Sequence, residues 1–358
     1  MKKGLKVLLI LILVLVVAIG ALLGVLTLTE YKPEAVEALE VPNPPGGGIL
    51  REGQTLELLS WNIGYGGLGK DSDFFMDGGK DTRSADQATV NAYLQGIASV
   101  LYDQGDYDLL LLQEVDQDST RTYGIDETQY LSGGVDLFAL NYSCPFVPIP
   151  LPPIGKVHSG LFTVSEYTVQ QAERVALPCP FSWPLRIANL KRCMLVSHLP
   201  IAGSDRELVL VNLHLEAYDS GEGKIAQSRQ LMELLETEYK KGNYVIAGGD
   251  FNQVFPGSLE VYPNTHSDLW TVGTLEESSL PDGFSFVYDL SAPTCRLLNQ
   301  PYDPADTENT QYYVIDGFVV SANVTVREVQ VLDQDFACSD HNPVRLQVCL
   351  GGAGTEQD

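Results

Sequence analysis

The stretch Cys338-Ser339-Asp340-His341-Asn342-Pro343-Val344 sets a carboxylate, an imidazole and a carboxamide side by side, just before the last apolar run of the chain. Burying such groups is costly unless each of them finds a polar partner. We therefore expect this triplet at the end of a structural element, facing something polar, with a strand resuming directly after it.

Two other apolar strands end in the same kind of residue. The run 109–112 is wholly apolar, as in a strand buried on both faces, and it leads directly into Gln113 and Glu114. The run 244–247 leads into G-G-D-F-N, where strand alternation places Asp250 and Asn252 on one side. Carboxylate oxygens at the mouth of a strand suit a hard cation such as magnesium.

Polar residues also occur within two strand-like segments. In V-L-V-N-L-H-L, residues 209–215, the period of two points Asn212 and His214 to the same face. Asp316 lies inside another apolar segment, where an unpaired carboxylate would be costly. We expect His341 to be its partner.

Taken together, these segments resemble the endonuclease/exonuclease/phosphatase superfamily, which has the deoxyribonuclease I-like fold. Six short motifs in family order carry the resemblance: W-N-I from Trp61, L-Q-E-V-D from Leu112, N-L-H-L from Asn212, G-D-F-N from Gly249, I-D-G-F from Ile315 and S-D-H-N-P-V from Ser339. The resemblance covers about residues 56–349. It implies an α/β fold, a four-layered two-sheet β-sandwich flanked by helices, with its site at one end of the sandwich.

The resemblance also implies roles for individual residues. The expected ligands of magnesium, with manganese as an alternative, are Asn62, Glu114 and Asp340. The expected catalytic residues are His214, Asp250, Asn252, Asp316 and His341. The expected substrate contacts are Asn212, His158 and Arg121, with a plain loop and a surface turn as the alternatives for the last two.

These residue types match the needs of phosphate ester hydrolysis, which are charge neutralisation, an aligned water and a stabilised leaving oxygen. Asp250 would orient or deprotonate the water, and Asp316 would fix the tautomer of His341. Some nuclease branches carry an acidic residue where this chain has Gly64. A DNA-repair-type nuclease is therefore less expected.

The N-terminus predicts a membrane anchor. Three lysines precede an apolar run over residues 7–28, which is long enough to cross a bilayer. Four glutamates follow, so the positive-inside rule places the bulk of the chain outside the cytoplasm. An uncleaved single-pass anchor is expected, with a removed signal peptide as the alternative.

The expected division is a cytoplasmic N-terminus (1–6), the anchor (7–28), a Pro/Gly-rich linker (29–54), one catalytic domain (55–350) and a tail (351–358). We expect helices at 87–102, opened by a capping box at Ser84-x-x-Gln87, and at 224–239. Expected strands are 55–63, 109–112, 160–164, 193–198, 207–215, 244–247, 312–320 and 344–350. The proline-rich segment 141–154 is expected to be a long ordered loop.

Composition narrows the function. A net charge of −25 opposes loose binding to nucleic acid, which would enter only as a substrate. The six cysteines contain no C-x-x-C pair, which argues against a zinc ribbon. We expect a monomeric, membrane-tethered, magnesium-dependent phosphoesterase acting on a phospholipid headgroup or a small phosphodiester. The alternatives are an extracellular nuclease of the same fold and a non-catalytic cell-surface binding protein built on it.

Overall fold

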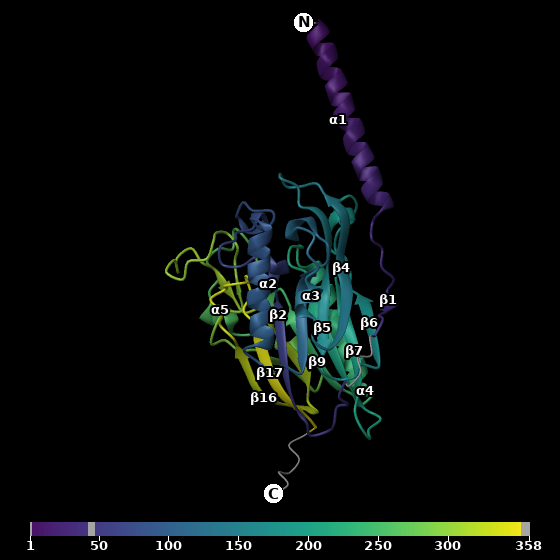
Figure 1. Ribbon diagram of the computed structural model, residues 1–358, viewed down its shortest axis with the longest axis vertical. Helices are drawn as coiled ribbons and strands as arrows, with labels where there is room; N and C mark the ends of the chain where they lie inside the picture. Colours follow the sequence, from purple (N-terminus) through teal and green to yellow (C-terminus); the bar gives the residue numbers. More distant parts are fainter. Residues whose placement is uncertain (1, 42–46, 352–358) are drawn as a thin grey trace.

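The computed structural model describes residues 2–41 and 47–351 of the chain. Figure 1 shows two large β-sheets stacked against each other, with helices on the outside and one long helix, α1 (Lys2–Leu28), projecting from one end. The expected four-layered sandwich is confirmed.

Two mixed sheets form the inner layers of the described chain. One has seven strands in the order β1 (Val36–Ala38), β6 (Gln171–Ala176), β7 (Cys193–Pro200), β8 (Glu207–His214), β9 (Tyr244–Asp250), β15 (Asp316–Ser321) and β12 (Phe284–Val287). The other has six, in the order β16 (Val324–Val331), β17 (Val344–Leu350), β2 (Thr55–Asn62), β3 (Leu109–Asp116), β5 (Gly155–Ser165) and β4 (Val135–Val147).

Shorter elements connect these strands. The two small sheets pair β10 (Gln253–Val254) with β11 (Gly273–Thr274), and β13 (Cys295–Arg296) with β14 (Tyr312–Tyr313). The remaining α-helices are α2 (Gln87–Tyr102), α3 (Thr128–Leu131), α4 (Glu222–Lys240) and α5 (Ser258–Val261). The 3-10 helices are η1 (Gly64–Gly66), η2 (Phe75–Asp77), η3 (Thr120–Thr122), η4 (Leu185–Ala188) and η5 (Glu277–Ser279).

The alternation of side chains along the strands builds the layers. In β8, Leu208 and Leu210 face the core between the two sheets, whereas Val209 and Val211 face outward and pack with residues of α4. On the other side of the molecule, α2 covers the outer face of the six-stranded sheet. Every second residue of a central strand is therefore available to the interior, as the period of two predicts.

Helix α1 is the one element of the described chain that is long and apolar enough to cross a membrane, with a mean hydropathy of 3.3. Most of its side chains are exposed, but its C-terminal end packs on the domain. Leu26 is buried in a cluster with Tyr142 and Ile187. Just after the helix, the carboxylate of Glu30 pairs with Arg186, with Nε and Oε1 2.8 Å apart.

The expected linker 29–54 is only partly a linker. Residues Val36–Ala38 form β1, which is an edge strand of the seven-stranded sheet and pairs antiparallel with β6. Leu50 is fully buried between the sheets and bridges Ile201. Backbone pairing at a sheet edge asks little of the side chains, which is why composition alone pointed to a linker. The Pro/Gly stretch 42–46, and all of the predicted tail except Gly351, lie outside the described residues.

The expectation of a long loop over residues 141–154 is wrong in its first half. Strand β4 continues to Val147 and pairs with β5, which starts at Gly155. The pairing register shifts between Cys144 and Val147, so Pro145 sits in an irregularity. A proline there does not remove a ladder hydrogen bond, and the strand tolerates it.

Two smaller expectations also need correction. Helix α2 is capped by Asp86, whose Oδ1 accepts a hydrogen bond from the backbone N–H of Thr89 at 2.8 Å, and not by Ser84. The side chain of Ser84 instead donates to Gly67 O. The expected strand 312–320 is divided into β14 and β15, which pair with different partners.

Candidate active site

Three neighbouring strands of the seven-stranded sheet place polar residues side by side at the same end of the sheet. His214 of β8 pairs in register with Asp250 of β9, and Asp250 pairs in register with Asp316 of β15. The close approach depends on Gly249, since a Cβ there would lie 1.9 Å from Leu213 O. Three chemically active side chains thus reach the same end of the sandwich.

The six-stranded sheet supplies the opposite wall. Asn62 is the last residue of β2, and its Nδ2 donates to Asp250 Oδ2 at 3.1 Å across the gap between the sheets. The same amide nitrogen lies 3.5 Å from Glu114 Oε1. Glu114 has φ of +56°, at a bulge in β3, and this local bend aims its carboxylate into the site.

The stretch over residues 338–344 is fixed by hydrogen bonds from both sheets. Trp61 Nε1 donates to His341 O at 2.8 Å, and Ser339 Oγ donates to Asn62 O at 2.7 Å. His341 Nδ1 lies 2.8 Å from Asp316 Oδ2, as the sequence predicted. Asn342 is satisfied as well, since its Oδ1 accepts from Gln334 N–H at 2.9 Å and its Nδ2 donates to Pro293 O at 3.0 Å. The imidazole and the carboxamide of the triplet therefore both have partners, directly before β17.

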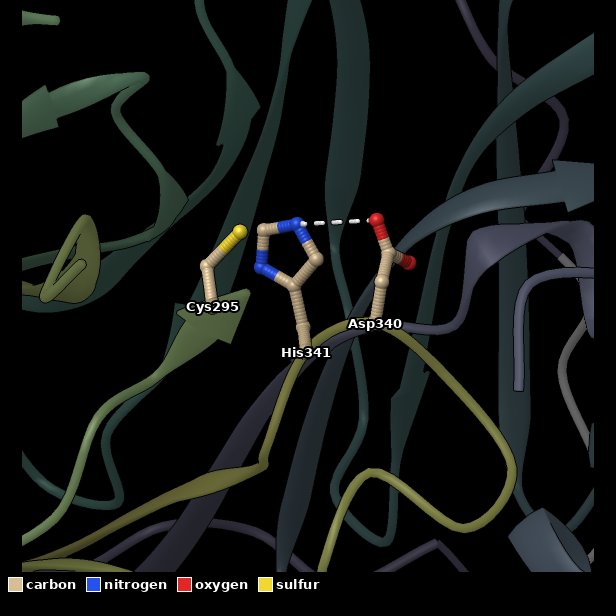
Figure 2. Close-up of side chains that lie close together, drawn as sticks. All are labelled: Cys295, Asp340 and His341. Atoms are coloured by element: carbon tan, nitrogen blue, oxygen red, sulfur yellow. Dashed lines mark ion pairs between the residues drawn. The ribbon is translucent and has the colours of Figure 1, made fainter. Parts of the chain in front are cut away.

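The second nitrogen of each histidine faces the carboxylates. His341 Nε2 lies 3.8 Å from Asp250 Oδ2 and 3.9 Å from Asp340 Oδ2. His214 Nε2 lies 3.4 Å from Asp250 Oδ2. Figure 2 shows the ring of His341 between Cys295 and Asp340, with one nitrogen directed toward the carboxylate.

Burial dominates the electrostatics of the two carboxylates. Burial raises the pKa of Asp250 to about 7; the Asp316 charge adds to the rise and His341 opposes it. Burial likewise raises the pKa of Asp340 to about 7, where His341 lowers it and the charge of Glu114 raises it. Both groups therefore exchange protons near neutral pH.

The two imidazoles shift in opposite directions. Burial, with smaller contributions from Arg192 and His341, holds the pKa of His214 well below its usual range, so its ring is neutral. Burial would also lower the pKa of His341, but the Asp316 carboxylate overcomes it and raises that pKa well above the usual range. A neutral and a protonated imidazole thus flank one carboxylate.

The donor set fits a hard divalent cation. Glu114 and Asp340 are neighbouring carboxylates, since the charge of Glu114 raises the pKa of Asp340. The Asn62 side chain lies beside Glu114, with its Nδ2 3.5 Å from Glu114 Oε1 and its Oδ1 accepting a hydrogen bond from the N–H of Gly64. Oxygen donors of this kind are the ligands of magnesium and manganese. Cys295 also lies near, but burial raises the pKa of its thiol to about 12, so it remains protonated and unsuited to a hard cation.

Gly64 explains why this chain lacks the extra acidic residue of some nuclease branches. Its φ is +51°, and a Cβ at this position would lie 2.8 Å from Asp340 Oδ1. Any side chain there would displace the Asp340 carboxylate from the site.

A cavity of about 670 Å³ opens on this group. Its lining includes Asn62, Glu114, His214, Asp250, Asn252, Asp340 and His341. Asp316 is not part of the lining and lies behind His341. The backbone N–H of Asn252 donates to Asp250 Oδ1 at 2.8 Å, and its side-chain Nδ2 donates to Leu215 O at 2.8 Å.

Asn212 does not reach the cavity, and its assignment as a substrate contact is wrong. It is fully buried between the sheets, where Nδ2 donates to Leu112 O and Phe162 O, each at 3.1 Å. Its Oδ1 accepts from Gln113 Nε2 at 2.9 Å. These bonds tie the two sheets together just beneath the site. Strand alternation predicted correctly which face of β8 carries Asn212, but it did not predict how deeply this side chain is buried between the sheets.

The two other expected substrate contacts differ from each other. Arg121 lines the cavity, but its Nε and one Nη donate to both oxygens of Asp116, and its guanidinium lies 3.6 Å from the ring centre of Tyr65. Few of its N–H donors therefore remain free to bind a substrate. His158 is absent from the lining and stacks on Phe138, so the structure does not bring it to the site.

Asp77 and Tyr218 are among the polar lining residues that sequence reasoning missed. Asp77, in η2, is 8% exposed and accepts a hydrogen bond from Tyr218 at 3.0 Å. Burial raises the pKa of Asp77 above its usual value. Neither residue ends a strand or matches a motif, so no local signal marked them.

Comparisons with known proteins agree with this geometry. The sequence profile of the endonuclease/exonuclease/phosphatase family matches residues 59–341. No curated protein sequence matches the chain. Among solved structures, an endonuclease/exonuclease/phosphatase from Beutenbergia cavernae DSM 12333 is 19% identical, with a TM-score of 0.54, over 84% of this chain and 72% of that one.

Two further structures share the fold. ANGEL2, a 2′,3′-cyclic phosphatase solved with adenosine-2′,3′-vanadate, is 16% identical, with a TM-score of 0.53, over 89% of this chain and 99% of that one. An endonuclease/exonuclease/phosphatase from Bacteroides vulgatus is 16% identical, with a TM-score of 0.52, over 83% of this chain and 99% of that one. At these identities the likeness concerns the fold.

Proposed function

Because the chain belongs to the endonuclease/exonuclease/phosphatase family, we propose that it is a magnesium-dependent hydrolase that cleaves a phosphate ester outside the cytoplasm. The observation that carries the proposal is the convergence of His214, Asp250 and His341 on one cavity beside Glu114 and Asn62. These residues come from segments distant in sequence, and their common location has the chemistry of a phosphoryl-transfer site.

Asn62, Glu114 and Asp340 would hold the cation. A divalent cation in this position neutralises phosphate charge and lowers the pKa of a bound water. The chain's own contribution is to fix the ligands, since Asn62 Oδ1 also accepts a hydrogen bond from the N–H of Gly64 at 3.1 Å. Manganese, which takes the same ligands, is the alternative metal.

Asp250 acts on the attacking water. Its pKa of about 7 places it close to the operating pH, where a general base is most effective. The backbone N–H of Asn252 and the amide of Asn62 orient its two oxygens. Neutral His214 and the second side-chain N–H of Asn252 then donate to the phosphate oxygens.

His341 serves the leaving group. Asp316 holds its Nδ1, so the proton on Nε2 points toward the cavity. Water adds to phosphorus as Asp250 takes its proton, the P–O bond to the leaving alcohol breaks, and His341 gives a proton to the departing oxygen. A phosphodiester and water thus become a phosphate monoester and an alcohol.

Helix α1 supports a location for the domain, and the net charge supports a class of substrate. Lysines precede the apolar run and glutamates follow it, which supports a single-pass anchor with the domain outside the cytoplasm. The acidic chain favours a phospholipid headgroup or a small phosphodiester over nucleic acid. We propose that the protein acts as a monomer at the membrane.

The test uses the full chain reconstituted in lipid nanodiscs. Hydrolysis of bis-p-nitrophenyl phosphate is measured with magnesium, with manganese and with a chelator, for the wild type, Asp250→Ala, His341→Ala and the surface control Asp106→Asn. We expect metal-dependent turnover in the wild type and the control only. Absence of turnover with either metal would contradict the proposal and favour a binding protein on this fold.

A substrate panel then separates the ester classes. Phospholipids, sphingomyelin, inositol phosphates and DNA are offered at equal phosphate concentration. Cleavage of lipid or small phosphate esters supports the proposed substrate. Efficient degradation of DNA with the other substrates untouched would instead identify the protein as a nuclease.

A further inference from the structure

The cavity that holds the catalytic residues continues well beyond them, into an apolar compartment. Three separate segments wall this compartment, and none of them carries a family motif: the last turns of α1, the β4–β5 hairpin and η4. The apolar lining residues from these segments include Leu23, Leu26, Tyr142, Val147, Ile154 and Ile187. Hydrolysis at the phosphorus atom has no use for this part of the cavity.

The contribution of α1 is the unusual feature. Figure 1 shows the end of α1 beside the upper end of β4, on the side of the domain from which the helix projects. Leu26 is 2% exposed and packs with Tyr142, Val157 and Ile187. A helix suited to a bilayer thus also forms one wall of the cavity that contains the catalytic residues.

Polar contacts fix the helix end against the domain. The Glu30 carboxylate is almost fully buried and pairs with Arg186, while Trp183 Nε1 donates to Thr27 Oγ1 at 3.2 Å. Lys191 Nζ lies 3.6 Å from Glu30 Oε1. These contacts hold the apolar wall in place next to the point where the chain would enter the bilayer.

Large apolar side chains surround this side of the domain. Ile149 at the hairpin tip is 68% exposed and Leu151 is 84% exposed. Trp183, just before η4, is 55% exposed, and Leu185, the first residue of η4, is 65% exposed. An exposed apolar group of this kind marks an interaction site. Its position next to α1 suits the boundary of a bilayer, where tryptophan is enriched.

Resting on the proposed hydrolase activity, we infer that the apolar compartment holds an acyl chain of a membrane lipid whose phosphate ester lies at the catalytic residues. The occupant is a bilayer lipid because the compartment adjoins the membrane helix at one end and His214 and Asp250 at the other. The cavity volume of about 670 Å³ is within the usual range of about 300–1,000 Å³ for such ligands. The substrate is therefore a lipid and not a small soluble phosphodiester.

The experiment compares alkyl 4-nitrophenyl phosphates that carry methyl, butyl, octyl and dodecyl chains, all cleaved at the same nitrophenyl ester. The full chain is reconstituted in nanodiscs with magnesium, and kcat/KM is measured for the wild type, Leu23→Trp and Ile154→Trp. Both substitutions place a larger side chain in the compartment. Because all proteins share one membrane, partition of the substrate into lipid cancels in the ratio of wild type to variant.

Leu22→Trp is the matched control. Leu22 is on the same helix and packs against the same cluster, yet it does not line the cavity. The methyl ester serves as an internal standard for the folded fraction of each variant. Should Leu23→Trp fail to insert or fold, Ile154→Trp tests the same compartment from the domain side.

We expect the ratio of wild type to variant to rise with chain length, by about tenfold or more between methyl and dodecyl, since each buried methylene is worth up to about fourfold in binding. For Leu22→Trp the ratio should stay near one at every length. A ratio independent of chain length in both compartment variants would overturn the inference. Failure of the wild type to cleave any of the four esters would instead contradict the proposed function.

Discussion

The Nδ1 atom of His341 lies 2.8 Å from Oδ2 of Asp316, and both side chains are buried. This contact joins the motif directly before β17 to the first residue of β15, in the opposite sheet. It holds the imidazole with its Nε2 toward Asp250 and Asp340. The orientation and the charge of His341 therefore both depend on one carboxylate.

Asp316→Asn keeps the shape of this contact and removes its charge. We expect kcat for bis-p-nitrophenyl phosphate to fall by about a hundredfold or more, the usual weight of an acid–base group. Because Asp316 raises the pKa of His341, the alkaline limb of the pH–rate profile should move to lower pH. An unchanged profile would show that His341 does not act through Asp316. Asp106→Asn is the control.

Glu114→Gln tests the cation site. The substitution removes a full negative charge from a ligand whose geometry the bulge in β3 fixes. A chelator should abolish turnover in the wild type and added magnesium should restore it. In Glu114→Gln the magnesium concentration for half-maximal activity should rise about tenfold or more, a loss of about 1.4 kcal/mol. Equal magnesium dependence in both proteins would place the cation elsewhere. Glu236→Gln, on the surface of α4, is the control.

Asn212→Leu separates structure from catalysis. Loss of the amide leaves buried polar groups of both sheets without partners, so the free energy of unfolding should fall by about 2–4 kcal/mol. Chemical denaturation measures this change. The kcat of the folded protein should remain close to the wild-type value. A fall in kcat as large as that of Asp250→Ala would show that Asn212 takes part in catalysis.

Glu127 makes stability depend on pH. Its Oε2 accepts from the backbone N–H of Asp116 at 2.8 Å, while Oε1 has no partner among the described residues. Burial, followed by the charge of Asp116, raises the pKa of Glu127 well above its usual range. An acid with a raised folded pKa contributes stability below its unfolded pKa and loses it as pH rises through the folded one.

Glu127→Gln cannot ionise and avoids that loss. Its melting temperature should exceed that of the wild type by several degrees at pH 8, and the difference should shrink toward pH 4. The control Glu236→Gln, on the outer side of α4, should show no such trend. A Gln variant that is less stable than the wild type at pH 8 would mean that the ionised carboxylate is stabilising in this position.

The strand-end residues could be predicted because their chemistry contradicts their surroundings. Polar groups next to apolar runs, after the run at Glu114 and Asp250 and before it at His341, indicate a site from local sequence alone, and the family order of the motifs assigns them to one fold. The structure brings all three to one cavity. The face of β8 on which Asn212 lies was also predicted correctly. How deeply Asn212 is buried depends on how closely the two sheets approach each other.

The features that the sequence could not predict arise from tertiary packing. Nothing in residues Val36–Ala38 indicates that they add to a sheet edge, since backbone groups make that contact. Pro145 argued against a strand, and a local irregularity accommodates it. The apolar run of α1 predicted a membrane span, yet Leu23 and Leu26 acquire their place in the cavity wall only through docking on the domain.

The central claim is that Glu114, Asn62 and Asp340 form one cation site beside His214 and Asp250. The most direct test is anomalous diffraction from a crystal of the protein soaked with manganese. We expect a single strong peak within about 2.5 Å of a Glu114 carboxylate oxygen, in the cavity shared with Asp250. A peak bound elsewhere, with none beside Glu114 at saturating manganese, would contradict it.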